Sequence, residues 1–493
     1  MAAIAFDNSY SALGSAFYTR VEPEPVSDPR LLFFNDDLAA MLGIQAGSLD
    51  IAEKAAVFSG NRIPDGAEPL AMVYSGHQFG AFNPRLGDGR AILLGEVVAG
   101  GERFDIQLKG SGRTPYSRNG DGRATVGAVL RESILSEAMA NLGVPTTRSL
   151  AVVSTGDLIR REGWLPGGVI TRVSRSFVRI GTFEYFASIG DHDAMKKLAN
   201  YVIDRIYPDL RDAGNPYEAL LAQVIERQAR LIAHWMRIGF IHGVMNTDNV
   251  SIAGETIDYG PCAFMDGFDH DQVFSSIDRQ GRYAYGNQPS IGQWNLVRFA
   301  ETLLPLLMQG DDTRAAVAAA ERLLNEFRDI YHQAWFDGMR EKLGLVTQAR
   351  DDARLIDDFL DLLDRDTADF TLAFRRLSSL GLEPSARDAE MKALFHRVPD
   401  LEAWLARWRQ RLRDENSRDA ERQQRMQRVN PLYIPRNHLV EAVIRAAEDH
   451  GDMQPFHQLG EVLQNPFEER PEWSEYARPP KPEEQVLQTY CGT

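Results

Sequence analysis

The sequence predicts a two-lobed α+β protein, in which a small β-rich lobe precedes a larger helical one. Three observations lead to this prediction. Residues 70–185 combine dense glycines with short apolar runs that are typical of strands. One clear helical pattern, at residues 125–142, interrupts that region, and from about residue 292 onward nearly every segment has helical periodicity.

The β-rich region begins with a predicted hairpin. Ala91–Val97 and Phe104–Lys109 are the two strands, and the glycine-containing loop 98–102 joins them. A third strand is expected at residues 169–173. Between them, apolar residues recur at helical spacing over 125–142, and Gly143 is a suitable stop.

Helices account for most of the remaining chain. Two are expected within residues 194–240, and the C-terminal region contains a clean apolar stripe. Residues 1–70, with proline-rich joints, are interpreted as an N-terminal extension, and the tail from Pro466 is expected to be extended. The expected division is an extension at 1–70, a β-rich N-lobe at 71–185, a C-lobe core at 186–300, and additional C-terminal helices with the tail at 301–493. The stripe consists of Leu401, Trp404, Leu405, Trp408 and Leu412.

Composition excludes several classes of protein. The 493 residues are 44% hydrophobic and 25% charged, which is ordinary for a globular chain. The net charge of −16 disfavours binding to nucleic acid or to an anionic membrane surface. There is no membrane-length apolar run and no signal-peptide pattern, and two cysteines cannot form a disulfide framework. We therefore expect a cytoplasmic monomer that binds neither nucleic acid nor membranes.

Two features of the β-rich region are compatible with nucleotide binding. Gly87 and Gly89 lie in a loop before a strand, where glycines let the backbone approach phosphates, although a tight turn is an equally good interpretation. Lys109 ends a strand and can place a positive charge on phosphate oxygens. Glu132, at the edge of the apolar arc of the following helix, could hold the Lys109 amine; otherwise both are solvated charges.

Two later segments supply hard oxygen ligands. Asn249 ends the segment His242-Gly-Val-Met-Asn-Thr-Asp-Asn249, and Asp258 lies in Ile257-Asp-Tyr-Gly260. Such oxygens suit Mg²⁺, which binds one or two side chains together with phosphates. His242 is expected to be a hydrogen-bonded structural residue. In order, these parts are those of a protein kinase, except that Val244 stands where the kinase base, an aspartate, belongs.

Long motifs then connect the chain with a known family. The chain resembles the selenoprotein O family of pseudokinase-fold protein adenylyltransferases over nearly its whole length, from about Phe6 to the tail. The matching segments are Tyr74-Ser-Gly-His-Gln-Phe-Gly80, Leu86–Glu96, Gln107–Arg118, Asp121–Thr125, Arg131-Glu-Ser133, His242-Gly-Val-Met-Asn-Thr-Asp-Asn249, Ile257–Pro261 and Asn430–Pro435.

The resemblance implies a kinase-like fold and a reaction. ATP would bind in a flipped orientation, AMP would pass to Ser, Thr or Tyr hydroxyls of proteins, and pyrophosphate would leave. Asp248 would be the general base, Lys109 and Glu132 an ion pair, and Asn249 and Asp258 the ligands of Mg²⁺ or Mn²⁺. Nucleotide contacts would come from Gly87, Gly89, Arg90, Lys109, Asp121, Gly122, Arg172, Arg179 and Asp258.

Arg172 and Arg179 also have a physical rationale. They are seven residues apart and would share a face if the segment were helical. Guanidinium groups suit a polyphosphate and would stabilise the charge on a pyrophosphate leaving group. Without the family resemblance, two surface arginines would be the better interpretation.

Several alternatives remain open at this level. The same fold could transfer UMP from UTP to Tyr or His with Mn²⁺, or could bind nucleotide without catalysis; a phosphotransferase is argued against by Val244. The family pairs a cysteine near the C-terminus with one in the loop after the metal aspartate. Cys491 fits the first position, but the loop has Phe274-Ser-Ser276, and Cys262 is not obviously equivalent. A redox switch is therefore left open.

Overall fold

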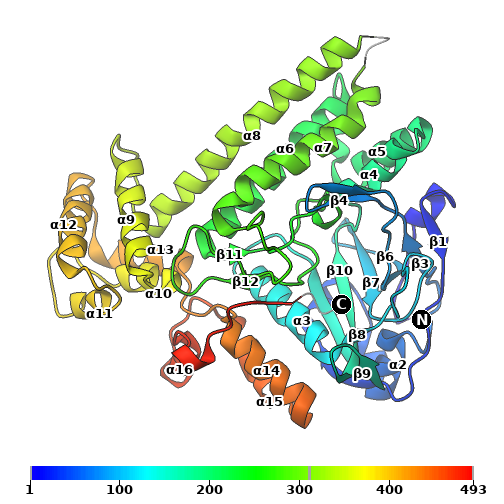
Figure 1. Cartoon of the computed structure of the whole chain (residues 1–493), viewed down its shortest axis with the longest axis horizontal. Helices are drawn as coiled ribbons and strands as arrows, with labels where there is room; N and C mark the ends of the chain where they lie inside the picture. The colour runs from blue at the N-terminus through cyan, green and yellow to red at the C-terminus, as the bar shows by residue number, and fades with distance from the viewer. Residues whose placement is uncertain (1–2, 309–311, 491–493) are drawn as a thin grey trace.

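The computed structural model describes residues 3–308 and 312–490. It confirms the predicted α+β class. One antiparallel sheet is built from the first third of the chain, and helices dominate the remainder. The long helices α6 (Pro216–Ile238), α7 (Gln288–Leu307) and α8 (Thr313–Lys342) run side by side away from the sheet (Figure 1). The division of the chain at residues 70, 185 and 300 stays a prediction.

The main sheet has the strand order β1-β3-β6-β7-β10-β9-β2, and β8 pairs with β10 beside this path. The predicted hairpin is present as β6 and β7, and the strand predicted at 169–173 is part of the longer β10. The sequence prediction missed β9 altogether. The first 70 residues supply both edge strands, β1 and β2. The bounds are β1 Tyr18–Arg20, β2 Arg30–Phe34, β3 Leu70–Met72, β6 Ala91–Ala99, β7 Glu102–Lys109, β8 Ala124–Thr125, β9 Arg148–Arg160 and β10 Trp164–Ser174.

Helix α3, Val126–Asn141, is the helix predicted at residues 125–142, and it packs against β9 and β10 of this sheet. The Thr125 side chain accepts a hydrogen bond from the Ala128 N–H and so caps the helix. Val129, Leu130 and Ile134 join β-sheet residues and the C-terminal helices in one apolar cluster. Because α3 is buried on several sides, Glu132 is held inside the protein rather than in solvent.

Two small pairs of strands flank the later loops. β4, Gly76–Gln78, and β5, Ala81–Asn83, form a hairpin between β3 and β6. β11, Phe240–Ile241, pairs with β12, Ala263–Phe264, and these strands bracket the segment that contains residues 242–260. The loops with the expected chemistry therefore lie between short, buried strands.

The two helices predicted within residues 194–240 are α5 and α6, and the predicted apolar stripe of α12 is fully buried. The tail from Pro466 is not simply extended, because it contains α16 and two short 3₁₀ turns. The remaining helices are α1 Asp36–Met41, α2 Ile51–Ser59, α4 Ile180–Ser188, α5 His192–Ile206, α6 Pro216–Ile238, α7 Gln288–Leu307, α8 Thr313–Lys342, α9 Asp352–Asp366, α10 Phe370–Leu377, α11 Asp388–Lys392, α12 Val398–Asp414, α13 Asp419–Val429, α14 Asn437–His450, α15 Gln454–Leu463 and α16 Ser474–Ala477.

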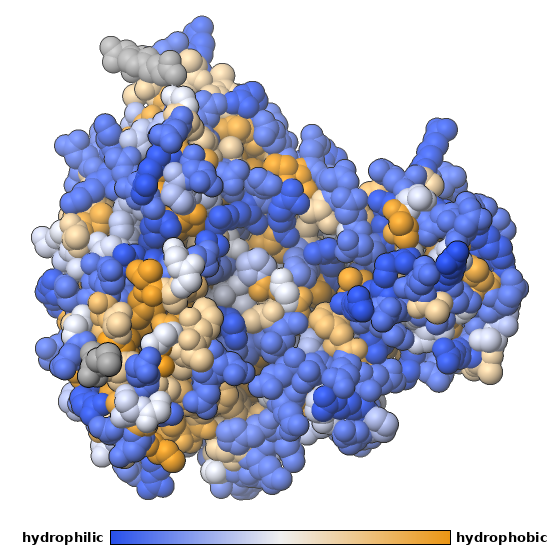
Figure 2. Space-filling view, turned by 180° about the vertical axis from the view of Figure 1, so that it is seen from behind, coloured by the Kyte–Doolittle hydropathy of each residue, from blue (hydrophilic) through white to orange (hydrophobic). Residues whose placement is uncertain are grey.

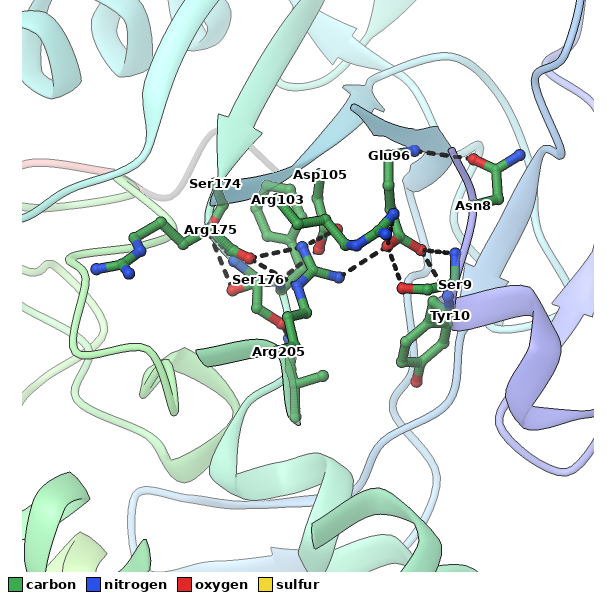
Figure 3. A network of polar contacts seen from close by, with 12 residues as sticks. Asn8, Ser9, Tyr10, Glu96, Arg103, Asp105, Ser174, Arg175, Ser176 and Arg205 are labelled. Atoms are coloured by element: carbon green, nitrogen blue, oxygen red, sulfur yellow. Dashed lines mark hydrogen bonds and ion pairs between the residues drawn. The ribbon is translucent and has the colours of Figure 1, made fainter. Parts of the chain in front are cut away.

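A buried polar network joins the N-terminal segment to the sheet and to α5 (Figure 3). Glu96 on β6 accepts hydrogen bonds from the Ser9 and Tyr10 N–H groups, at 2.9 and 2.6 Å. Arg205 on α5 donates to Glu96 at 3.2 Å and to Asp105 at 2.6 Å. We call Glu96, Arg103, Asp105 and Arg205 the Arg205 network. It fixes the first residues of the chain to the sheet.

Hydrophilic residues cover most of the face shown in Figure 2, and apolar residues gather at its lower left, over the sheet-containing part of the molecule. None of the helices in the described ranges carries an apolar stretch long enough to cross a bilayer.

Candidate active site

Asp258 is the centre of a cluster of cationic side chains. Its carboxylate oxygens lie 2.6 Å from an Arg172 nitrogen, 2.9 Å from an Arg179 nitrogen and 3.5 Å from the Lys109 nitrogen. Asp258 has a φ of 59°, a left-handed conformation that aspartate tolerates better than most residues. The turn after Ile257 thus aims this carboxylate at three cations.

Lys109 and Glu132 form the ion pair expected from the sequence. The Lys109 ammonium donates to a Glu132 oxygen at 2.5 Å, and Arg172 reaches the other oxygen at 3.1 Å. Arg172 also bonds to the Gln107 side chain. We call Lys109, Glu132, Arg172, Arg179 and Asp258 the Asp258 cluster. Its members come from β7, α3, β10 and two loops, so the cluster forms only when these elements pack together.

Electrostatics keep Asp258 ionised. Burial alone would raise its pKa, but the nearby positive charges, first that of Arg172 and then those of Arg179 and Lys109, hold the pKa of Asp258 well below its usual range. The carboxylate is therefore available as an anionic ligand at any physiological pH.

Arg172 and Arg179 do not lie on a helix, so the condition for a shared helical face is not met. Arg172 is on β10, and Arg179 follows the strand, immediately before α4. The β-branched run around Arg172 pairs with β7 and β9, which fixes the extended conformation. Both guanidinium groups nevertheless meet at Asp258, because the chain bends between them. Arg172 stacks over Phe177 and Arg179 over Tyr74.

Asp248 lies beside this cluster in a different environment. Burial raises the pKa of Asp248 to about 7, and the positive charge of Arg179 opposes part of that rise. Gln78 donates to one carboxylate oxygen at 3.3 Å, whereas the other, Oδ1, is buried and has no hydrogen-bond partner among the described residues. Asp248 therefore has spare acceptor capacity and a pKa in the range of general bases.

Asn249 and His242 shape the same loop. The Asn249 amide nitrogen donates to the Val244 carbonyl at 2.9 Å, which leaves the amide oxygen as the atom that can bind a cation. His242 is buried and its ring bonds to the Ile257 carbonyl at 3.0 Å, while burial lowers its pKa. It is the structural histidine that the sequence led us to expect.

The residues present can bind a hard divalent cation whose coordination shell is completed by phosphate oxygens. Asn249 and Asp258 offer an amide and a carboxylate oxygen, and a carboxylate retains lone pairs when two arginines bind it. Across residues 3–308 and 312–490, no group of three His, Cys, Asp or Glu side chains could hold a metal by itself. An amide and a carboxylate oxygen suit a metal whose other ligands are phosphate oxygens.

The glycine loop is a tightly packed turn. A Cβ on Gly87 would lie 2.4 Å from the Tyr116 ring, and one on Gly89 2.9 Å from the Tyr116 carbonyl. The Gly87 N–H donates to the Tyr74 carbonyl, and the Asp88 N–H donates to that of Met72. In this structure those two donors serve the turn rather than an open anion cradle.

A cavity of about 1080 Å³ opens next to the cluster. Arg90, Lys109 and Glu132 line one part of it, and the start of α3, helix α14 and tail residues 485–490 line the remainder. Arg161 also lines it and binds the expected nucleotide contact Asp121 at 2.8 Å. Gly122 is required beside it, because a Cβ there would lie 2.0 Å from the Gly112 carbonyl.

The tail closes this cavity against the loop that follows Asp258. The Thr489 N–H donates to the Phe274 carbonyl at 2.7 Å, and its carbonyl accepts from the Ser276 N–H at 3.1 Å. Cys262 is buried in the apolar core. Cys491 lies outside the described residues, so the redox question stays open.

Sequence reasoning gave no role to the β4–β5 hairpin, although its residues stand in one of the quoted motifs. His77 binds Glu184 at 2.5 Å, and Glu184 also accepts from Thr247, the neighbour of Asp248. The feature of the sequence that could have pointed to this role is the Tyr74–Gly80 motif, which is long and specific for a loop.

Comparison with known proteins identifies the family of this chain. The model of the family described as "Protein adenylyltransferase SelO" matches residues 1–464. Proteins named "Protein nucleotidyltransferase YdiU" from Rhodopseudomonas palustris (strain HaA2) and Bradyrhizobium sp. (strain BTAi1 / ATCC BAA-1182) are each 56% identical over 489 residues, with 99% of both chains covered. The relative from Rhizobium meliloti (strain 1021) is 55% identical over 494 residues and the full length of both chains. With its whole length matched in this way, the chain belongs to the SelO family of protein nucleotidyltransferases.

Proposed function

We propose that this protein transfers AMP from ATP to Ser, Thr or Tyr hydroxyls of other proteins and releases pyrophosphate. The observation that carries the proposal is the convergence of Lys109, Arg172 and Arg179 on Asp258, next to a carboxylate with general-base properties. The family description and the names of the relatives support the same class of reaction.

The charge of the Asp258 cluster favours a polyphosphate ligand. Ion pairs join its three cations to two carboxylates, those of Glu132 and Asp258. Asp88 and Asp248 also act on Arg179, but burial raises the pKa of both, so the cluster carries one positive charge in excess whenever these two are protonated. A buried excess charge is costly unless a counter-charge arrives. Guanidinium groups bind phosphate oxygens through parallel N–H donors and would stabilise negative charge on departing pyrophosphate.

Asp248 is the proposed general base. It would accept the proton of the substrate hydroxyl as that oxygen attacks the α-phosphate, and the bond to pyrophosphate would break. Its raised pKa of about 7 suits proton transfer near neutral pH, and its unpartnered oxygen retains lone pairs that can accept a hydrogen bond. Val244, at the position of the usual kinase base, cannot accept a proton.

Asn249 and Asp258 are the proposed ligands of Mg²⁺ or Mn²⁺, both of which prefer oxygen donors. The metal would supply charge neutralisation on the phosphates when bound. We place the flipped nucleotide between the cation cluster and the adjoining cavity, with Gly87, Gly89, Arg90, Lys109, Asp121, Gly122, Arg172, Arg179 and Asp258 as its contacts. A cytoplasmic monomer acting on protein substrates is part of this proposal.

The test uses ATP labelled at the α or at the γ position. Purified protein with Mg²⁺ or Mn²⁺ and a protein acceptor should retain the α label and not the γ label on protein. Asp248→Asn should lower this transfer by about 100- to 10,000-fold and leave a measurable residue, whereas Asp361→Asn, on the exposed side of α9, should not lower it. Retention of γ label would identify a phosphotransferase and contradict the proposal.

UMP transfer is the competing specificity, because the relatives' printed name leaves the nucleotide open. Replacing ATP by α-labelled UTP in the same assay, with Mn²⁺, measures it directly. A higher kcat/KM for UTP, with label on Tyr or His, would replace AMP by UMP in the proposal. Nucleotide binding without any transfer would indicate a non-catalytic scaffold.

A further inference from the structure

The β4–β5 hairpin makes a continuous set of contacts with the loop that contains Asp248. The His77 N–H donates to the Thr247 hydroxyl at 2.7 Å, and the Phe79 N–H donates to the Asn246 side chain at 3.1 Å. Between them, Gln78 donates through its amide nitrogen to Asp248. Consecutive residues of the hairpin thus bind consecutive residues of the loop, about 170 positions apart in the sequence.

Close packing keeps this contact in one arrangement. A Cβ on Gly76 would lie 2.8 Å from Asp248 Oδ1, so only glycine lets the hairpin approach so closely. On the other side, Gly181 lies against the Ser75 carbonyl, where a Cβ would be 2.2 Å away. Phe79 has a φ of 51°, a conformation that costs a non-glycine residue free energy. This strain is maintained at the point where the hairpin meets the loop.

Glu184 on α4 is a second anchor of the hairpin. Glu184 on α4 is buried and binds both the His77 ring and the Thr247 hydroxyl, so one carboxylate connects the two segments. Tyr283 donates to the Asn246 side chain at 2.6 Å. The backbone of the hairpin is therefore fixed independently of Gln78, which leaves the Gln78 side chain free to act on Asp248 alone.

We propose that Gln78 is a positioning residue for Asp248: its amide nitrogen orients the carboxylate toward the acceptor hydroxyl. Gln78 is the side-chain donor to this carboxylate among the described residues. A carboxylate without a fixed donor can rotate and spend less time in a productive geometry, and misplacement of a base lowers the rate of proton transfer. The inference rests on the proposed role of Asp248 as base.

The variants separate orientation from folding. Gln78→Leu keeps the volume and removes the donor, Gln78→Glu adds a repelling charge, and Gln78→His retains an N–H. Gln78→Leu should lower kcat about tenfold, with the KM for nucleotide changed less than about twofold. Gln78→Glu should lose more, and Gln78→His should recover part of the rate. Ala81→Ser, directly opposite Gln78 on the exposed strand, is the matched control and should behave as wild type.

Two further measurements decide the matter. In an Asp248→Asn background, Gln78→Leu should have almost no additional effect, because the group that it orients is gone. Amide hydrogen exchange of residues 246–249 should be faster in Gln78→Leu, and this readout needs no activity. A full tenfold loss in both backgrounds, or unchanged kcat and exchange, would overturn the positioning role. Absence of transfer by wild type, with faster exchange in Gln78→Leu, would instead refute only the proposed function.

Discussion

The Asp258 cluster and the Arg205 network are both buried groups of charges, but their charge balance differs. In the Arg205 network, two arginines face the carboxylates of Glu96 and Asp105, and Arg103 also pairs with the exposed Asp7, so no positive charge is in excess. In the Asp258 cluster, three cations face the two carboxylates of Glu132 and Asp258. The Asp258 side chain is also 20% exposed, whereas those of Glu96 and Asp105 are 1% and 3% exposed.

The difference separates a structural network from a site. A network without excess positive charge satisfies its own charges, and its consequence is a fixed arrangement of the segment around Ser9 and Tyr10, the sheet and α5 (Figure 3). We expect a cluster with an excess of positive charge beside a cavity to bind an anionic ligand. Charge balance therefore distinguishes the two clusters more clearly than burial does.

The largest expected effect is that of Asp258→Ala on activity. This change removes the proposed metal ligand and the carboxylate that orients two arginines, so transfer should fall about 1000-fold or more. Metal-dependent nucleotide binding should weaken as well. Label transfer and nucleotide titration with and without Mg²⁺ measure both effects. Wild-type activity at saturating Mg²⁺ or Mn²⁺ would remove Asp258 from the metal site.

Arg205→Met should lower stability and leave nucleotide binding unchanged. It leaves Glu96 and Asp105 buried without their main cation, which we expect to lower the free energy of unfolding by about 3–5 kcal/mol. The KM for nucleotide should not change in the protein that remains folded. Thermal unfolding and steady-state kinetics at low temperature provide the comparison. A raised nucleotide KM with unchanged stability would mean that the network belongs to the site.

The two clusters were not equally predictable from the sequence. Lys109 and Glu132 could be paired because a strand end and a helix face each have a defined direction. Gln78 could not be placed on Asp248, because the hairpin reaches it across about 170 residues and no local pattern encodes such a contact. For the same reason, the edge strands β1 and β2 were missed, since each is defined by partners far along the chain.

β9 and the Arg172 segment show a second limit. β9 contains Ser149, Ser154 and Gly156, so its apolar pattern is interrupted, although pairing with β2 and β10 on both sides makes it a strand. The seven-residue spacing of Arg172 and Arg179 is compatible with a shared helical face, but it does not require a helix. Pairing with β7 and β9 decided the conformation at Arg172.

Glu255 is a buried carboxylate next to the Arg205 network, and its ionisation makes stability depend on pH. It accepts hydrogen bonds from the Ser174 hydroxyl and the Arg175 N–H, and burial raises its pKa from 4.5 to about 7. Because the folded state binds this proton more tightly, the stabilising contribution is complete below about pH 4.5 and is lost as the pH rises through about 7.

Glu255→Gln should remove that dependence, since the amide oxygen can accept both hydrogen bonds without a charge. The variant should exceed wild type in stability by up to about 3 kcal/mol at pH 8 and match it near pH 4.5. Unfolding midpoints measured at both pH values test this. An equal difference at both would show that ionisation of Glu255 is not the cause.

The smallest expected effect is the stabilisation of the folded protein by nucleotide. If the excess charge of the Asp258 cluster awaits a polyphosphate, ATP with Mg²⁺ at about 100 times its Kd should stabilise wild type by about 2.7 kcal/mol. Arg179→Met removes the excess cation and should lose most of this increment. Arg103→Met, the same change at the edge of the Arg205 network, should retain it, because that network has no unmatched positive charge for a nucleotide to neutralise. Thermal shifts of the three proteins, measured against ATP concentration, give the increments. Equal increments for both variants would mean that nucleotide binding does not depend on the charge excess around Asp258.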